Sequence, residues 1–181
     1  MRLRDRVSDR SGANQASGSP ARLLIGGVGY RWQRDASFGL AASDALAQMD
    51  WPPGVEVADL GYGAIYVAQD IADADPPYRR LILLAGVERG RAPGQVYIYQ
   101  WPGASPDQDE IQARIREAGA GVIDLDHLLC IAQHFQALPE DVLLVEVEPL
   151  DTHGGEGLSP EVDDLLPQII EFVHKQACGV R

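Results

Sequence analysis

The sequence feature that most constrains the fold is one continuous apolar segment, Arg80 to Val87 (RLILLAGV). Polar and apolar residues do not alternate in it, so both of its faces suit a protein core. Such a run is typical of a central strand in a sheet that helices cover on both sides. Arg22 to Val28 (RLLIGGV) predicts another buried strand, and Val142 to Val147 (VLLVEV) predicts the last strand of the chain.

Helical and strand patterns alternate between these runs. Apolar residues recur near the 3.6-residue period from Phe38 to Met49, and Trp51-Pro52-Pro53-Gly54 must end that helix. Val55 to Asp59 alternates as a strand does, and Ala64 to Ile71 predicts a short helix.

One strand is expected to run against the others. Gln95 to Trp101 (QVYIYQW) predicts a strand soon after the central one. The connection Glu88 to Gly94 is too short for a crossover helix, so we expect these two strands to pair antiparallel. The polar residues 102–120 predict only one or two helical turns, around Ile111 and Ile115.

Two helices complete the pattern. Asp124 to Leu138 predicts a helix that Pro139 ends, and Ser159-Pro160 predicts an N-cap and first position of a C-terminal helix. The alternation predicts an α/β fold: a three-layer sandwich, phosphorylase/hydrolase-like, around about five strands. The sheet is expected to be mostly parallel with one antiparallel strand.

Length and composition predict one domain. We expect a single domain over residues 21–178, preceded by a disordered basic tail over residues 1–20. The net charge of −12 argues against nucleic acid as a partner, because phosphate binding needs a basic surface. No segment reaches the roughly 20 apolar residues that cross a bilayer, so no membrane contact is expected. Two cysteines fit a reducing cytoplasm.

Five motifs follow one another along the chain. They are Gly27-Val28-Gly29-Tyr30 with Arg34 to Gly39 after it, Val55-Glu56-Val57-Ala58-Asp59-Leu60-Gly61, Ala85-Gly86-Val87-Glu88 leading to Ala92-Pro93-Gly94-Gln95-Val96-Tyr97, Leu144-Val145-Glu146-Val147-Glu148-Pro149, and Gly157-Leu158-Ser159-Pro160-Glu161-Val162. In this order and spacing, over residues 22–175, the chain resembles the hydrogenase maturation proteases. The matching family patterns are Gly-x-Gly-Asn, Val-Glu-Val-x-Asp-Gly-Gly, Asp-Ala-Val-Asp leading to Glu-Pro-Gly-x-Val-Tyr, Leu-Val-Gly-Val-Glu-Pro and Gly-Leu-Ser-Pro-Glu-Val.

The resemblance implies an endopeptidase that removes a C-terminal extension from a [NiFe]-hydrogenase large subunit after nickel has been installed. It also places the family's nickel-contacting Glu, Asp and His on Ala36, Ala85 and Gly121 of this chain. Nickel takes imidazole nitrogen or carboxylate oxygen as ligands, and alanine and glycine offer neither. We therefore expect no metal at the family's position and no other cofactor. The implied partner is a [NiFe]-hydrogenase large subunit or a maturation factor.

Three carboxylates lie next to the lost ligand positions: Asp35, Glu88 and Asp124. One interpretation is a displaced carboxylate cluster at the C-terminal edge of the sheet, where α/β proteins place ligand sites. The other is that Asp35 and Asp124 cap helices and Glu88 lies in a hairpin loop. Caps and turns are the commoner use of such residues, which favours the second interpretation.

A second group, His127, Cys130 and His134, has the spacing i, i+3 and i+7 on a predicted helix. These residues project largely opposite an expected core stripe of Leu125, Leu128, Leu129, Ala132 and Phe135. A metal site on that face is one interpretation; surface residues or a protein contact are the commoner one. No third glycine follows Gly27-Val28-Gly29 at the spacing of a dinucleotide loop, so a Rossmann cofactor is not expected.

Three aromatic residues, Tyr30, Trp32 and Tyr62, are expected near the family's cleft. They form either a partner-binding surface or a filling for the volume of the lost ligands. Two functional hypotheses remain at this point. In the first, the chain is a non-catalytic relative that binds a hydrogenase subunit or maturation factor. In the second, it is an active endopeptidase with a shifted carboxylate site.

Overall fold

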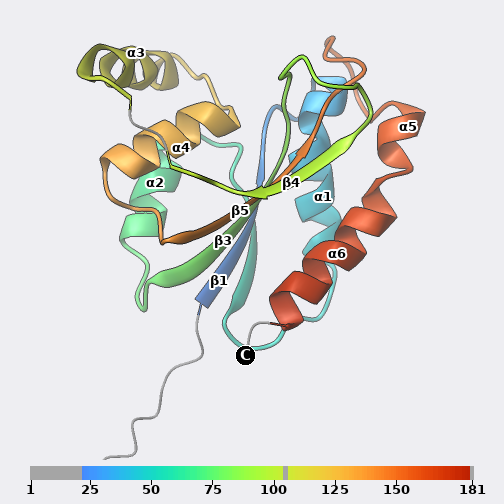
Figure 1. Cartoon of the computed structure of the whole chain (residues 1–181), viewed down its shortest axis with the longest axis horizontal. Coiled ribbons are helices and arrows are strands. Elements are labelled where there is room, and N and C mark those ends of the chain that lie inside the picture. Colours follow the sequence, from blue (N-terminus) through green and yellow to red (C-terminus); the bar gives the residue numbers. More distant parts are fainter. Residues whose placement is uncertain (1–21, 104–105, 180–181) are drawn as a thin grey trace, which may run out of the picture.

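The computed structural model describes residues 22–103 and 106–179, which form a three-layer α/β sandwich (Figure 1). The middle layer is a five-stranded sheet with the order β2-β1-β3-β5-β4. Its strands are β1 (Arg22–Val28), β2 (Val55–Asp59), β3 (Tyr78–Gly86), β4 (Val96–Gln100) and β5 (Asp141–Val147). Every pairing is parallel except that of β4 with β5. The predicted fold class is thereby confirmed. The predicted tail, residues 1–20, lies outside the described residues.

Helices cover both faces of the sheet, as the uninterrupted apolar strands predict. On one face lie α1 (Phe38–Leu46) and α6 (Leu166–Cys178); on the other lie α2 (Ala64–Ala72) and α4 (Leu125–His134). The central strand β3 divides its side chains between the two cores. Ile82 and Leu84 face α1 and α6, whereas Leu81, Leu83 and Ala85 face α2 and α4. Fully burying one such leucine contributes about 1.5–3 kcal/mol.

The neighbour of the antiparallel strand differs from the prediction. β4 pairs with β5, not with β3, because β5 lies between them. Burial explains this order. The residues of β5 are buried on both faces, which requires a central place, whereas residues of β4 are alternately exposed, which suits a sheet edge. The connection from Glu88 to Gly94 therefore passes over the end of β5.

Two helical regions also differ from the prediction. The segment expected to hold one or two turns forms a 12-residue helix, α3 (Gln108–Gly119), which Asp107 caps by accepting a bond from the Glu110 amide. None of its residues is buried, so the helix has no buried face that a strong apolar stripe in the sequence would mark. The C-terminal helix is divided into α5 (Pro160–Asp163) and α6, which begins at Leu166. Pro167 lacks an amide hydrogen and therefore favours a new helix start.

None of the helices in residues 22–103 and 106–179 has the length and apolar composition that a bilayer crossing requires.

Candidate functional site

A cleft of about 310 Å³ lies at the C-terminal edge of the sheet. Its walls come from the loop after β1, the end of β3 and the start of α4. This is the edge at which open α/β sheets commonly bind ligands. The structure brings five of the predicted site positions into the lining, namely Tyr30, Ala36, Ala85, Glu88 and Asp124.

The loop after β1 approaches β3 closely because a glycine stands at the end of that strand. A Cβ atom on Gly86 would lie 2.1 Å from the carbonyl oxygen of Asp35. On the loop itself, Gly29 has a φ of 144°, and a Cβ there would lie 2.2 Å from the carbonyl oxygen of Ala36. Side chains at these two positions would push the loop away from the sheet. The two glycines thus set the narrow spacing of the cleft wall.

Asp35 does not line the cleft but is fully buried beneath the loop. One carboxylate oxygen, Oδ2, accepts bonds from the amides of Leu150 and Asp151 at 2.9 and 3.0 Å and from Ser159 Oγ at 2.8 Å. Oδ1 accepts a bond from the Ser159 amide at 2.7 Å. The prediction that Asp35 caps the first helix is wrong, because no side chain caps α1. Asp35 instead fastens the segment 150–159 to the loop after β1.

Ser159 is also used differently from the prediction. Its backbone occupies the N-cap position of α5, but its side chain makes no capping bond. The hydroxyl donates to Asp35 instead.

The other two candidate carboxylates do reach the cleft. Asp124 caps α4, as predicted, by accepting a bond from the His127 amide at 2.8 Å. Glu88 is exposed, and its Oε1 lies 3.5 Å from Thr152 Oγ1. A displaced cluster of all three carboxylates is therefore not assembled, because Asp35 points away into a fully bonded site.

His127, Cys130 and His134 do not share an exposed face. His127 is buried, and its ring nitrogens lie 2.8 Å from Asp124 Oδ1 and 2.6 Å from Glu117 Oε2. Cys130 is buried as well, and this burial raises the pKa of its thiol. His134 is exposed and contacts the Phe135 ring edge-on. The expectation of a surface group fails because α3, which the sequence did not reveal as a full helix, covers α4.

Phe135 is a related correction. It was expected in the core stripe of this helix, but 53% of it is exposed. The other predicted members of the stripe are buried.

The three predicted aromatic residues take different positions. Tyr30 lines the cleft, and its hydroxyl accepts a bond from the Ile123 amide at 2.9 Å. Trp32 and Tyr62 are exposed, at 63% and 48%, and neither lines the cleft. Of the three, only Tyr30 lines the cleft together with Ala36 and Ala85.

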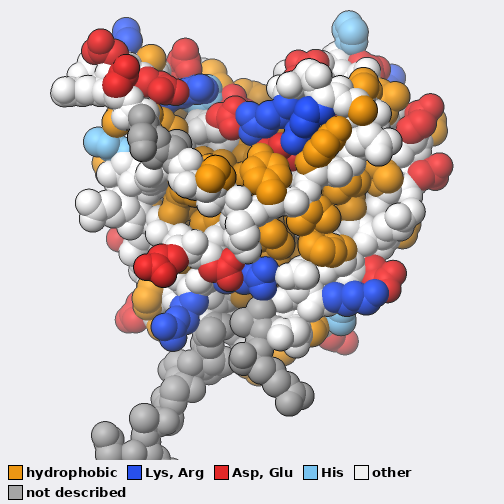
Figure 2. All heavy atoms as spheres, in the orientation of Figure 1, with side chains coloured by type: hydrophobic (Ala, Val, Ile, Leu, Met, Phe, Trp, Pro, Cys, Tyr) orange, Lys and Arg blue, Asp and Glu red, His pale blue; other side chains and the backbone are white. Residues whose placement is uncertain are grey.

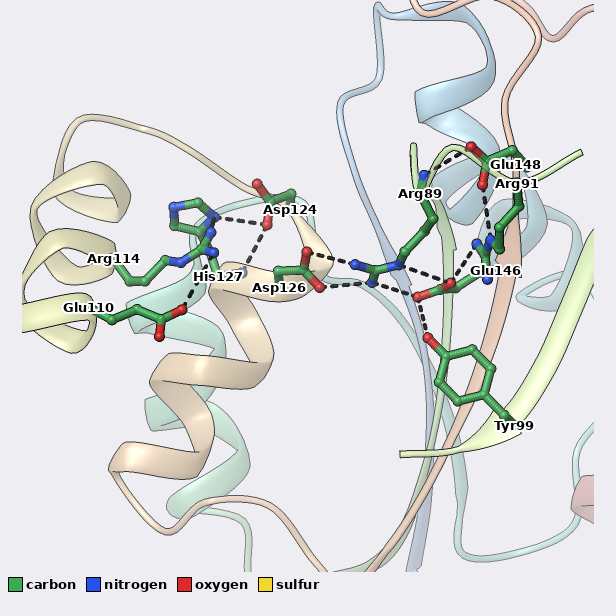
Figure 3. A network of polar contacts seen from close by, with 10 residues as sticks. All are labelled: Arg89, Arg91, Tyr99, Glu110, Arg114, Asp124, Asp126, His127, Glu146 and Glu148. Atoms are coloured by element: carbon green, nitrogen blue, oxygen red, sulfur yellow. Dashed lines mark hydrogen bonds and ion pairs between the residues drawn. The ribbon is translucent and has the colours of Figure 1, made fainter. Parts of the chain in front are cut away.

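A network of charged side chains stands beside the cleft (Figure 3). At its centre is the β5 residue Glu146, which is fully buried. The Arg89 guanidinium donates to both carboxylate oxygens, Arg91 donates at 2.7 Å and the Tyr99 hydroxyl at 2.8 Å. Two further bonds, at 2.9 and 2.8 Å, join Arg89 to Asp126 on α4, which lines the cleft. Arg89 therefore links α4 to β5.

A second buried carboxylate, Glu148, fixes the loop that carries these arginines. Its Oε1 accepts bonds from the amides of Arg89 and Gly90, both at 2.9 Å, and its Oε2 accepts a bond from Arg91 Nε at 3.0 Å. Figure 2 shows blue side chains gathered in the hollow between α3 and the loops above β4; they are arginines, because the one lysine in the sequence, Lys175, lies on α6.

Burial and hydrogen bonding act in opposite directions on these carboxylates. Burial by itself would raise the pKa of Glu146, but bonds from Arg89, Tyr99 and Arg91 outweigh it and hold the pKa below its usual range. Glu148 follows the same pattern: its bonds from the loop amides and Arg91 lower its pKa despite burial. Burial and the bond to Glu146 raise the pKa of Tyr99 to about 12. Both glutamates are therefore anions at neutral pH.

Sequence reasoning missed this network although it left a signal. Glu146 is a charged residue inside the otherwise apolar run of β5, and buried charge must be compensated. Two arginines in the short loop after β3 are the available partners. The predicted pairing of β4 with β3 left no place for β5 next to this loop, so it gave no reason to expect Glu146 beside the two arginines.

The described side chains do not fit a nickel site. Ala36 and Ala85 present methyl groups to the cleft. Gly121 is exposed and does not line the cleft, and Asp124 stands in the wall on that side. Within residues 22–103 and 106–179, no three His, Cys, Asp or Glu side chains are grouped so that they could hold a metal ion. The nearby Asp126 is already bonded through both oxygens to Arg89.

Comparison with known families decides the relationship. A model described as hydrogenase maturation protease matches residues 41–176. The chain belongs to this family. A comparison with curated protein sequences finds no match.

Solved structures of hydrogenase maturation proteases share its fold. A hydrogenase 2 maturation peptidase from a Thaumarchaeota archaeon is 31% identical with a TM-score of 0.62, and the match covers 88% of this chain and 99% of that one. The maturating endopeptidase HybD from E. coli is 25% identical with a TM-score of 0.61, covering 84% and 89%. HybD from Thermococcus kodakarensis, at 17% identity, a TM-score of 0.57 and coverage of 86% and 99%, shows the shared fold alone.

Proposed function

We propose that this member of the hydrogenase maturation protease family is a maturation factor that binds a hydrogenase large subunit or a maturation factor without cutting it. The observation that carries the proposal is the cleft. The loop after β1, the end of β3 and the start of α4 form this cleft, but Ala36 and Ala85 stand where the family resemblance places metal-contacting carboxylates.

The chemistry of the remaining groups supports this proposal. Of the carboxylates near the lost positions, Asp35 is fully hydrogen-bonded in the interior and Asp124 serves as a helix cap. Glu88 is exposed to solvent, with no basic residue bonded to it in the described part of the chain. Alanine methyl groups offer nickel no ligand, and Asp35 is not in the cleft lining, so the three carboxylates do not face one another across the cleft.

Binding, in contrast, needs a shaped surface and exposed anchors. The cleft supplies the shape, and Trp32 and Tyr62 supply exposed aromatic side chains on loops near the same edge of the sheet. Aromatic residues often contribute most of the free energy of a protein interface. The net charge of −12 favours association with a basic surface on the partner.

The decisive experiment mixes the purified full chain with a nickel-loaded precursor of the hydrogenase large subunit. We expect the two proteins to elute together from a sizing column and the intact mass of the precursor to stay unchanged. Specific shortening of the precursor C-terminus by the pure chain would overturn the proposal. Loss of that shortening in Glu88→Ala and Asp124→Ala variants would then assign the shifted-carboxylate endopeptidase.

Matched variants test the binding surface. Trp32→Ala and Tyr62→Ala are each expected to weaken binding about tenfold or more, which corresponds to about 1.4 kcal/mol. Phe135→Ala is the control, because it also removes an exposed aromatic ring but lies at the C-terminal end of α4, away from the cleft. Equal affinities for all three variants would contradict the assignment of this surface.

A further inference from the structure

We propose that Arg89 is a built-in cation that replaces a metal ion at this edge of the sheet. One consequence of the proposal rests on the partner binding proposed above: the partner should be bound equally well with and without nickel.

The first support is the position of Glu146. In the family pattern Leu-Val-Gly-Val-Glu-Pro, this residue of the chain replaces the glycine. Glu146 is in register with Ala85 on the neighbouring parallel strand, so both side chains project from the same face of the sheet. Ala85 is itself the position at which the resemblance places a metal-contacting aspartate. A carboxylate is thus missing from β3 and present on β5, one strand away.

The second support is the way in which this carboxylate is neutralised. Arg89 Nη2 lies 2.8 Å from Glu146 Oε1, and Arg89 Nε lies 3.3 Å from Oε2. The same guanidinium holds both oxygens of Asp126. It therefore bridges a β5 carboxylate and an α4 carboxylate, which is the connection that a bound metal ion makes between protein ligands (Figure 3).

The third support is that a guanidinium does not release its charge. Arginine stays protonated at every physiological pH, and its fixed fork matches carboxylate geometry. The bonds to Glu146 and Asp126 raise the pKa of Arg89 further. A divalent cation would have to displace it to reach the carboxylates. The α4 wall of the cleft is therefore held in place by the chain itself, with no need for an ion.

The test measures thermal unfolding of the full-length chain with nickel, zinc or cadmium chloride as the probe. The wild-type melting temperature is expected to be the same with and without each ion. Arg89→Gln removes the cation but keeps a polar side chain, so its melting temperature should fall, and a divalent ion should restore part of the loss. Arg89→Gln combined with Glu146→Gln should show no response to the ions, because one of the two carboxylates is gone.

Arg31→Gln is the matched control. Arg31 also bridges two carboxylates, Asp44 and Asp59, but on the exposed surface. Its loss should leave the melting temperature nearly unchanged and create no response to ions. If Arg89→Gln does not fold, Arg89→Lys replaces it, because one ammonium group cannot hold both carboxylates and should give a smaller loss with a smaller metal response.

The proposal is overturned if nickel raises the melting temperature of the wild-type chain. It is also overturned if no ion raises that of Arg89→Gln. Where Arg89→Lys is used instead, a wild-type melting temperature that no ion changes overturns it. None of these measurements involves a partner, so their outcome does not depend on whether the proposed partner binding is right.

A final comparison is the affinity for nickel-free and nickel-loaded large subunit, which should agree within about twofold. A strong preference for the loaded form would contradict the inference while leaving partner binding itself established.

Discussion

Arg31 and Arg89 each join two carboxylates, and the two groups differ chiefly in burial. Arg31 contacts Asp44 and Asp59, each at 2.6 Å, and all three side chains are 41–54% exposed. Arg89 contacts Asp126, which is also partly exposed, and Glu146, which is not exposed at all. Water and salt screen the first group strongly and the second only weakly. The same arrangement of charges is therefore expected to contribute little to stability on the surface, at Arg31, and much more around the buried Glu146, at Arg89.

The largest expected effect is that of removing the buried arginine. Arg89→Gln leaves Glu146 with Arg91 and Tyr99 only, and breaking a buried ion pair costs about 3–5 kcal/mol. We expect a loss of unfolding free energy near the lower end of that range, since part of the compensation remains. Urea denaturation at pH 7 measures it. A loss below about 1 kcal/mol would erase the difference between the two arginines.

The next largest effect is expected from replacing Asp35, a buried carboxylate that is held by amides and a hydroxyl. Asp35→Ala removes the acceptor of three backbone amides and one hydroxyl. Each buried donor left unpaired costs about 1–3 kcal/mol, and water entering the space of the deleted side chain is expected to pair some of these donors in the variant. We therefore expect a loss of about 2–3 kcal/mol by urea denaturation. The amides of residues 150–159 should also exchange hydrogen faster, and unchanged exchange would contradict the role assigned to Asp35.

The pH dependence of stability sharpens the comparison further. The folded-state pKa values of Glu146 and Glu148 lie below their ordinary value of 4.5. Their stabilising contribution is therefore complete above about pH 4.5 and is lost as the pH falls through the folded values. We expect the melting temperature of the wild type to fall steeply in that acidic range. Glu146→Gln should flatten the curve, whereas Arg31→Gln should leave its shape unchanged; equal curves for wild type and Glu146→Gln would contradict the network.

The smallest effect is expected at the exposed arginine. Arg31→Gln should cost about 0.2–1 kcal/mol, as exposed ion pairs generally do. The loss should shrink further in 1 M salt, where charges are screened within about 3 Å. Urea denaturation at low and high salt measures both values. A loss equal to that of Arg89→Gln would show that burial is not the deciding difference.

The sequence revealed the sheet more completely than the site. The apolar runs predicted β1, β3 and β5 because a strand buried on both faces has a simple pattern. Asp124 was identified as a possible cap because capping depends on residues close in the sequence. The bonds of Asp35 to residues 150–159 were not predicted, because they join parts of the chain more than 100 residues apart.

The Arg89 network escaped prediction for a related reason. It depends on β5 lying between β3 and β4, and strand order is a tertiary property that local patterns do not contain. The same holds for His127, whose burial results from the cover that α3 gives to α4. The expectation that no metal binds at the family's position, in contrast, rests on Ala36 and Ala85 themselves, because no arrangement of the backbone gives a methyl group a lone pair.

The most direct measurement is the intact mass of a nickel-loaded large-subunit precursor after incubation with the pure chain. If the account is right, the precursor is bound and its mass is unchanged at the end of the incubation. A precursor shortened at one defined peptide bond, with no other protease present, would contradict it.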